Sequence, residues 1–96
     1  MSKNIINLKF DNTISGLAGN EYGASVYKQQ LQDKIDLKNS NIIIFPDNIK
    51  RVAISFIQGM FNEILKKIDK QEIEKYIEIQ TSYQELTEKI ISNIKF

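Results

Sequence analysis

Ser55 is the residue whose type and position best suit chemistry in this chain. It follows a polar link at residues 47–51 and opens an apolar-striped segment that runs to Ile68. At the N-terminus of a helix, a serine hydroxyl lies among unpaired N–H groups and the positive end of the helix dipole. Ser55 therefore serves either as an ordinary N-cap, worth about 1 kcal/mol of stability, or as a phosphoacceptor or anion contact. Spacing alone favours the N-cap.

Charged residues lie just before Ser55. Lys50 and Arg51 could hold an anion beside the helix N-terminus, although such a pair more often belongs to a solvated turn. Asp47 follows Pro46 at the end of an apolar run, where a carboxylate could bind a metal or polarise a ligand, and where aspartate also favours turns. The turn is the simpler interpretation for these residues, and the functional one stays open.

The chain contains no cysteine and no histidine. This composition excludes disulfide frameworks, thiolate zinc sites and Cys–His nucleophilic pairs. The paired carboxylates Glu72/Glu74 and Glu85/Glu88 fall on predicted polar faces, which do not suit general acid–base catalysis. The glycines near residue 20 match neither the dinucleotide fingerprint nor the Walker loop. A carboxylate site for Mg²⁺ is the one metal chemistry left open, and we expect no catalytic residue, metal or cofactor.

The 96 residues suit one domain, spanning residues 1–96. The 13 basic and 12 acidic side chains nearly balance, and Arg51 is the only arginine. Nucleic-acid binders usually carry a basic excess and several arginines, so we expect no nucleic-acid partner. The longest purely apolar run, residues 42–45, is far shorter than the roughly 18 residues that span a bilayer. We expect a cytoplasmic protein with no signal peptide and no membrane partner.

The elements that position Ser55 are predicted from apolar periodicity. Residues 42–45 form an unbroken apolar run, which is typical of a central strand buried on both faces. The stripe from 57 to 68 follows helical spacing and predicts a helix over 55–69 packed on a sheet. Gly59 lies inside that helix, where glycine costs about 1 kcal/mol relative to alanine. A close approach to another backbone would explain it.

Strand and helix patterns alternate before the central strand. Residues 5–10 alternate apolar and polar side chains as a half-buried strand does. Turn chemistry at 11–12 favours a hairpin with a short return strand. A helix is expected over 21–37, with Asn20 as its N-cap.

The same alternation continues to the C-terminal end. A strand is expected over 74–80, and Ser82 with Glu85 forms a capping box that opens the last helix. Tyr83 is expected in the core or half-buried. The predicted fold class is α/β, with a single small sheet of three to four mixed strands and about three helices packed on it.

Residues 42–65 resemble the STAS-like domain family, the small relatives of the sulfate-transporter and anti-sigma-factor-antagonist domain. The likeness lies in the apolar strand, the spaced apolar residues Ile49 and Val52, and the dipeptide Ser55-Phe56 that opens an apolar helix. Ile57, Gln58 and Gly59 stand where the family commonly has acidic and small residues. The resemblance implies an α/β fold of the STAS-like type.

This resemblance also implies a function. Because STAS-like domains bind protein partners, the resemblance implies that this chain is a non-enzymatic regulatory module. Its partner would be a protein such as a kinase-like ATPase or a switch protein. The implied interface surrounds the N-terminus of helix 55–69 and consists of Asn48, Lys50, Arg51, Ser55 and Gln58. Phosphorylation of Ser55 would then break or remodel binding by adding charge to a desolvated interface.

Two further possibilities stay open. The short chain and its departures from the family pattern fit a small inhibitor encoded by a phage or mobile element, which would block a host enzyme by stoichiometric binding. A homo-oligomer is also open, because the half-polar strand at 75–80 could lie at a sheet edge and pair with a second copy. Lys75 and Glu78 would discourage that pairing.

Overall fold

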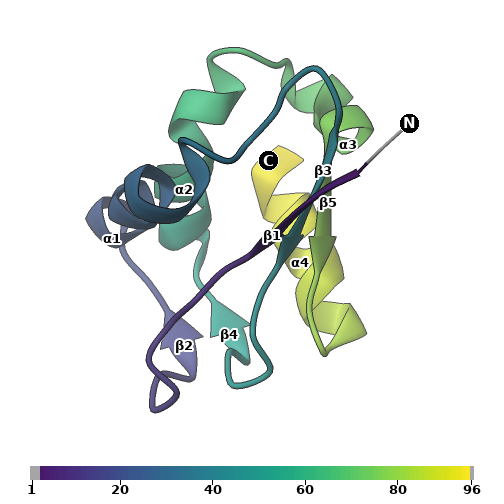
Figure 1. The fold of residues 1–96 in the computed structure, drawn as a ribbon. Coiled ribbons are helices and arrows are strands. Elements are labelled where there is room, and N and C mark those ends of the chain that lie inside the picture. The colour runs from purple at the N-terminus through teal and green to yellow at the C-terminus, as the bar shows by residue number, and fades with distance from the viewer. Residues whose placement is uncertain (1–2, 96) are drawn as a thin grey trace.

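The computed structural model of the chain describes residues 3–95 (Figure 1). Its strands form two sheets, and the strands within each sheet are parallel. The main sheet has the strand order β1-β3-β5. A smaller sheet pairs β2 with β4 and lies below the main sheet in Figure 1. The strands are β1 (Lys3–Asn7), β2 (Gly16–Leu17), β3 (Ser40–Ile44), β4 (Arg51–Val52) and β5 (Ile77–Gln80).

The helices of residues 3–95 pack beside and behind the main sheet in the view of Figure 1. Figure 1 shows α1 and α2 together on one side of the molecule and α4 behind the sheet. The helical elements are α1 (Asn20–Val26), the π-helical η1 (Tyr27–Leu31), α2 (Ile54–Leu65), the 3₁₀ segment η2 (Lys70–Glu72), α3 (Ile73–Tyr76) and α4 (Gln84–Lys95). No helix within residues 3–95 is both long enough and apolar enough to cross a bilayer.

The predicted α/β class is confirmed, but the strands divide between two sheets and pair only in parallel. Each strand of the main sheet reaches the next through a crossover that contains a helix, as parallel pairing requires. The hairpin expected after the first strand does not form, because β2 pairs with β4 rather than with β1. The turn itself does form, since the Thr13 N–H donates to the Asp11 carboxylate over 2.9 Å.

The apolar run at 42–45 supplies the central strand, and the two faces of that strand differ. Ile43 points into the core beside Ile6 of β1. On the opposite face, Ile42 is paired with Ile5, which is 59% exposed. Neither Ile5 nor Ile42 belongs to the core cluster found within the described residues. Ile42 is itself only 8% exposed, so β3 is buried on both faces as predicted, although the core cluster reaches it through the face that carries Ile43.

The helix predicted over 21–37 is shorter and less regular. α1 ends at Val26, continues as the π-helical η1 to Leu31, and gives way to turns. Asn20 is the first residue of α1 and not its N-cap. The cap is Gly19, whose φ of 100° is a conformation that glycine adopts without strain.

Asn41, at the start of β3, is a fully buried polar hub. Its amide oxygen accepts from the Asn4 amide and from the Asp36 N–H, each over 2.9 Å. Its amide nitrogen donates to the carbonyl oxygens of Asp36 over 2.7 Å and Tyr76 over 3.1 Å. These bonds hold the segment before β3 as a turn, so the first helix cannot continue into it. They also bind the end of α3, and the strand expected over 74–80 is helical up to Tyr76.

α1 and α2 cross at two glycines. A Cβ on Gly59 would lie 2.0 Å from the Asn20 carbonyl oxygen, and one on Gly23 would lie 2.2 Å from the Phe56 carbonyl oxygen. Any larger residue at either position would force the two backbones apart. The close backbone approach predicted at Gly59 is confirmed. Tyr22 packs edge-on against Phe56 beside the crossing, with ring centroids 5.4 Å apart.

Candidate functional site

Ser55 lies in the first turn of α2, and it is not the N-cap. The cap is Ala53, whose N–H donates to the Leu17 carbonyl oxygen over 2.7 Å and keeps it extended at the end of β4. The half-buried Ser55 hydroxyl accepts from the Gly19 N–H over 3.0 Å. It therefore ties the first turn of α2 to the start of α1 instead of capping its own helix.

The predicted interface residues do not form one surface. Asn48 is half-buried, and its amide donates to the carbonyl oxygens of Asp11 over 3.2 Å and Ile14 over 2.7 Å. It holds the loop before β2 in place, so its amide donors are already engaged within the fold. Gln58 is exposed on α2 and lines a separate hollow between α2 and α4.

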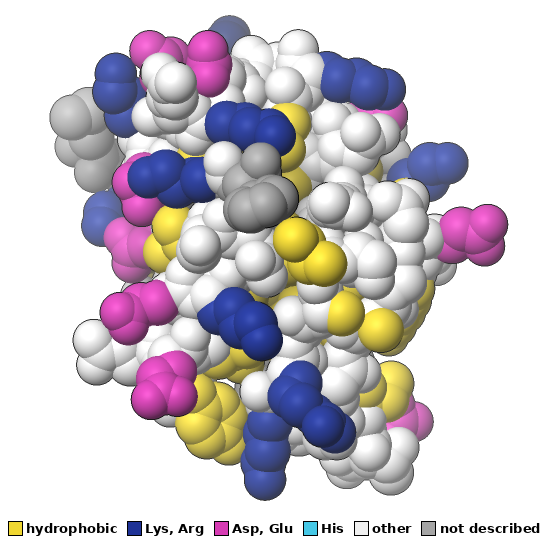
Figure 2. Space-filling view, turned by 180° about the vertical axis from the view of Figure 1, so that it is seen from behind, with side chains coloured by type: hydrophobic (Ala, Val, Ile, Leu, Met, Phe, Trp, Pro, Cys, Tyr) yellow, Lys and Arg dark blue, Asp and Glu magenta, His cyan; other side chains and the backbone are white. Residues whose placement is uncertain are grey.

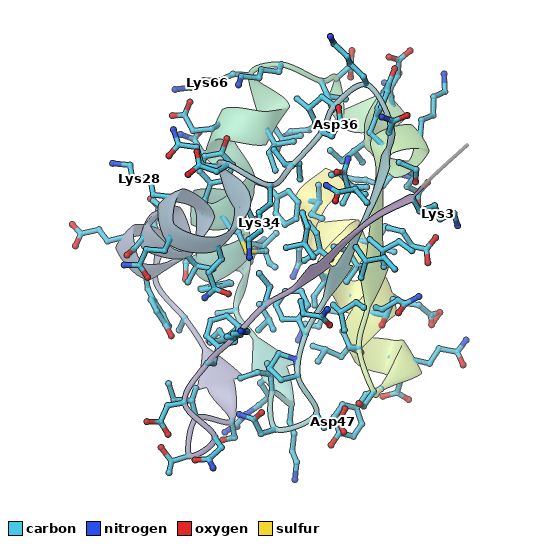
Figure 3. All side chains as sticks on the ribbon, in the orientation of Figure 1. Lys3, Lys28, Lys34, Asp36, Asp47 and Lys66 are labelled. Carbon is cyan, nitrogen blue, oxygen red and sulfur yellow. The ribbon has the colours of Figure 1, made fainter. Side chains whose placement is uncertain are left out.

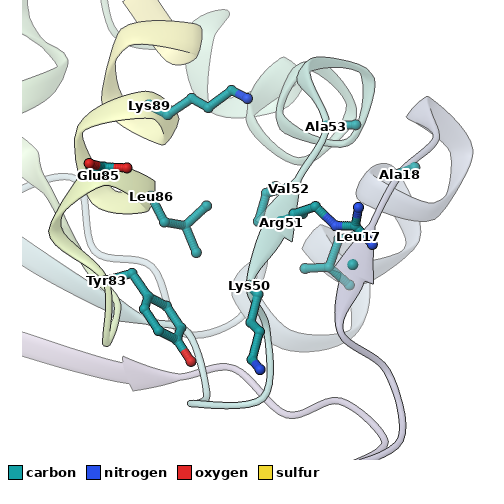
Figure 4. Close-up of a pocket in the computed structure, with 11 residues that line it drawn as sticks. Leu17, Ala18, Lys50, Arg51, Val52, Ala53, Tyr83, Glu85, Leu86 and Lys89 are labelled. Carbon is teal, nitrogen blue, oxygen red and sulfur yellow. The ribbon is translucent and has the colours of Figure 1, made fainter.

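Lys50 and Arg51 do share a cavity. They line a groove of about 690 Å³ between the small sheet and α4, which we call the β4–α4 groove (Figure 4). Proteins hold small ligands and short peptide segments in hollows of this size. The small sheet and α4 supply its lining, which consists of Gly16, Leu17, Ala18, Lys50, Arg51, Val52, Ala53, Tyr83, Glu85, Leu86 and Lys89.

One face at the start of α4 forms a wall of the groove. Tyr83, Leu86 and Lys89 recur every three residues, and Figure 4 shows all three turned toward β4. Leu86 is buried in the core, whereas Tyr83, expected in the core or half-buried, is 40% exposed. Tyr83 and Lys89 were not among the predicted site residues. Their spacing from Leu86 places them on one face at the start of α4, and the packing of α4 beside β4 brings that face to the groove.

The start of α4 is fastened to the turn after β3. The Ser82 hydroxyl donates to the Asp47 carboxylate, and the Tyr83 hydroxyl donates to the Asp47 carbonyl oxygen over 3.3 Å. The Tyr83 N–H donates to the Thr81 hydroxyl over 3.0 Å. Ser82 does not form the predicted capping box, because α4 begins at Gln84 and Ser82 lies one residue before the N-cap position. Asp47 acts as a turn residue that anchors one wall of the groove.

The rim of the groove is cationic. Lys50, Arg51 and Lys89 are exposed, and within residues 3–95 none of them forms an ion pair. Glu85, on α4, is the one carboxylate among the lining residues (Figure 4). Figure 2 shows Lys and Arg side chains on the lower part of the rear face of the molecule, and others on its upper part. Unpaired cations around a hollow raise the local concentration of anionic groups.

Shifted pKa values belong to groups elsewhere in the fold. Hydrogen bonds from the Asn39 amide and the Lys38 N–H lower the pKa of Asp36. Burial, and to a lesser extent the charge of Glu63, raises the pKa of the Tyr27 phenol. Residues 3–95 contain no cluster of three or more acidic side chains placed to hold a metal ion.

Comparison with known proteins gives no relative of this chain. No family model, no curated protein and no solved structure matches it. The chemistry of the β4–α4 groove is thus the basis for a functional proposal.

Proposed function

We propose that this protein is a non-enzymatic regulatory module of the STAS-like kind, which acts in the cytoplasm and binds a protein partner through the β4–α4 groove. The groove itself carries the proposal, because Lys50 and Arg51 meet Tyr83, Leu86 and Lys89 around it. Interfaces between proteins commonly combine an apolar centre with a polar rim. Leu86 and its small neighbours supply the apolar part, and the cations supply the rim.

The proposed interface stays next to the start of α2, as the family resemblance implies. Ala53, the N-cap of α2, lines the groove together with Lys50 and Arg51. Asn48 and Gln58 leave the proposed contact surface, because Asn48 fastens a loop and Gln58 faces another hollow. The partner surface is therefore displaced from the helix axis toward β4 and α4.

Ser55 is the proposed switch of this interface. A phosphate would place nearly two negative charges at a half-buried position between the first turns of α1 and α2. We expect such a group to displace the start of α2, and Ala53 at the groove with it. Phosphosite mapping after incubation with ATP and source-cell extract tests the modification. A Ser55→Asp variant that binds the partner as tightly as the Ser55→Ala variant would argue against the switch.

Cross-linking in native extract tests the interface. A photoreactive residue replaces Lys89 in one sample and Lys28 in a control sample. Lys28 is a suitable control because it lies in η1, far from Asp47 at the end of the groove (Figure 3). We expect one protein to be cross-linked in stoichiometric amount from position 89, and Arg51→Glu to abolish its capture. A partner captured equally from position 28, or unaffected by Arg51→Glu, would refute the proposal.

The identity of the recovered partner separates two functions. A kinase-like ATPase or a switch protein would support the regulatory module. A host enzyme whose activity falls in proportion to the protein added would support a stoichiometric inhibitor encoded by a phage or mobile element.

A further inference from the structure

The chemistry of the β4–α4 groove narrows the class of partner. We infer, on the basis of the function proposed above, that the groove binds an acidic segment of a partner protein that carries one large apolar side chain. Carboxylates of the segment pair with Lys50, Arg51 and Lys89. The apolar side chain packs over Ala53 and Leu86.

Charge complementarity is the first argument. Lys50, Arg51 and Lys89 line the groove without an ion-pair partner within residues 3–95. Glu85 is the one carboxylate among the lining residues, so the cations of the groove outnumber its acidic groups. The planar guanidinium of Arg51 can bind one carboxylate through two parallel hydrogen bonds. The lysines are flexible point charges that can pair with carboxylates in many orientations. An acidic segment can therefore pair with three cations without breaking an ion pair that exists within residues 3–95.

The shape of the groove is the second argument. Gly16, Ala18 and Ala53 are small, and they leave space in front of Leu86 and Val52. A volume of about 690 Å³ is several times what a single carboxylate fills. Filling the rest with an apolar side chain removes water from the small residues and from the exposed ring of Tyr83, which is favourable. A small inorganic anion would leave that part of the groove wet.

A nucleic-acid strand is the competing polyanion. Its backbone would extend beyond the groove and needs a basic track to follow. The whole chain has 13 basic and 12 acidic side chains, and Arg51 is its only arginine. A short acidic peptide fits within the reach of Lys50, Arg51 and Lys89, so the local cationic rim suits a protein segment better.

Fluorescence anisotropy with a designed peptide tests the inference. The probe is a short fluorescein-labelled peptide of glutamates around one central phenylalanine. We expect saturable binding that weakens about tenfold, or about 1.4 kcal/mol, when Lys50→Glu and Arg51→Glu are combined. Lys89→Glu should also weaken it, and added salt should weaken it further. These side chains are exposed, so the variants should keep the thermal unfolding curve of the parent protein.

Matched controls make the test specific. Lys28→Glu combined with Lys34→Glu changes net charge by the same amount away from the groove, and binding should stay within about twofold of the parent. A peptide with lysine for every glutamate should not bind, and one with alanine for phenylalanine should bind more weakly. Failure of the acidic peptide to bind, or equal weakening by the control pair, would overturn the inference. If a single-stranded oligonucleotide binds more tightly than the peptide, the inferred ligand is wrong and the groove binds nucleic acid instead.

The two proposals fail in different ways. If cross-linking from position 89 recovers a partner that docks as a folded surface, and the acidic peptide does not bind, the partner site stands and its proposed ligand class does not. If the peptide binds the groove but no native partner cross-links there, the groove chemistry stands and the regulatory function does not.

Discussion

The α1–α2 crossing and the β4–α4 groove both adjoin the start of α2, yet they are filled in opposite ways. At the crossing, two glycines bring backbone against backbone, with the Cβ of any residue at Gly59 overlapping the Asn20 carbonyl oxygen. In the groove, β4 and α4 stand apart, and the long side chains of Tyr83 and Lys89 border the space between them.

This difference separates stability from binding. The crossing is closely packed, so a larger side chain there must displace a helix. Such a change lowers the free energy of unfolding. The groove is bordered by exposed side chains that make no ion pair within residues 3–95, so a change there should alter what binds and leave the fold intact. Each prediction below tests one side of this contrast.

The largest effect is expected from Gly59→Ala. The added methyl group would overlap the Asn20 carbonyl oxygen, and α1 and α2 would have to separate. We expect the free energy of unfolding to fall by about 3 kcal/mol or more, measured by urea denaturation. Gly16→Ala is the matched control, because its Cβ would meet only Arg51 atoms at 3.8 and 3.9 Å, an ordinary contact. Equal losses in both variants would show that the crossing is not specially tight.

The next largest effect is expected from Asn41→Leu. The variant leaves the Asp36 N–H and the carbonyl oxygen of Tyr76 without the Asn41 side chain as a partner. We expect a loss of about 2–3 kcal/mol in the same denaturation measurement. Asn7→Leu, at an exposed position of β1, should change stability by about 0.5 kcal/mol or less. A neutral Asn41→Leu would mean that the buried hub does not hold the turn before β3.

A smaller pair of effects distinguishes the two residues at the start of α2. Ser55→Ala should cost about 1 kcal/mol, because the Gly19 N–H loses its acceptor. Ala53→Ser should stabilise by about 0.5–1 kcal/mol, because it adds a side-chain oxygen at an N-cap that has none. Thermal unfolding measures both. Destabilisation by Ala53→Ser would indicate that the helix is capped elsewhere.

The smallest effect on stability is expected at the rim of the groove. Lys50→Gln and Arg51→Gln should each change the unfolding free energy by about 0.5 kcal/mol or less, because both side chains are exposed and make no ion pair within residues 3–95. The same variants should weaken partner binding, measured by anisotropy. A large loss of stability from either variant would erase the contrast between the groove and the crossing.

Periodicity predicted the parts of the fold that depend on nearby residues. The apolar run at 42–45 indicated the central strand, and the striped segment after it indicated α2. The position of Gly59 indicated a close backbone approach. In each case the signal lies within one element, so the sequence alone carries it, even though the contact that explains Gly59 is made by α1.

The features that were missed depend on contacts between distant segments. Ala53 is the N-cap because the Leu17 carbonyl oxygen holds it, and nothing near Ala53 in the sequence reports that bond. The first helix stops early because the Asn41 side chain binds the turn that follows it. Lys89 joins the groove only because α4 packs beside β4.

The central claim is that the partner occupies the β4–α4 groove and leaves the crossing untouched. Titration of the ¹⁵N-labelled protein with the cross-linked partner's segment, followed by amide NMR shifts, tests it most directly. We predict large shifts at Val52, Ala53 and Leu86 and none at Gly23 and Gly59. Shifts centred on Gly23 and Gly59, with the groove amides unmoved, would contradict the account.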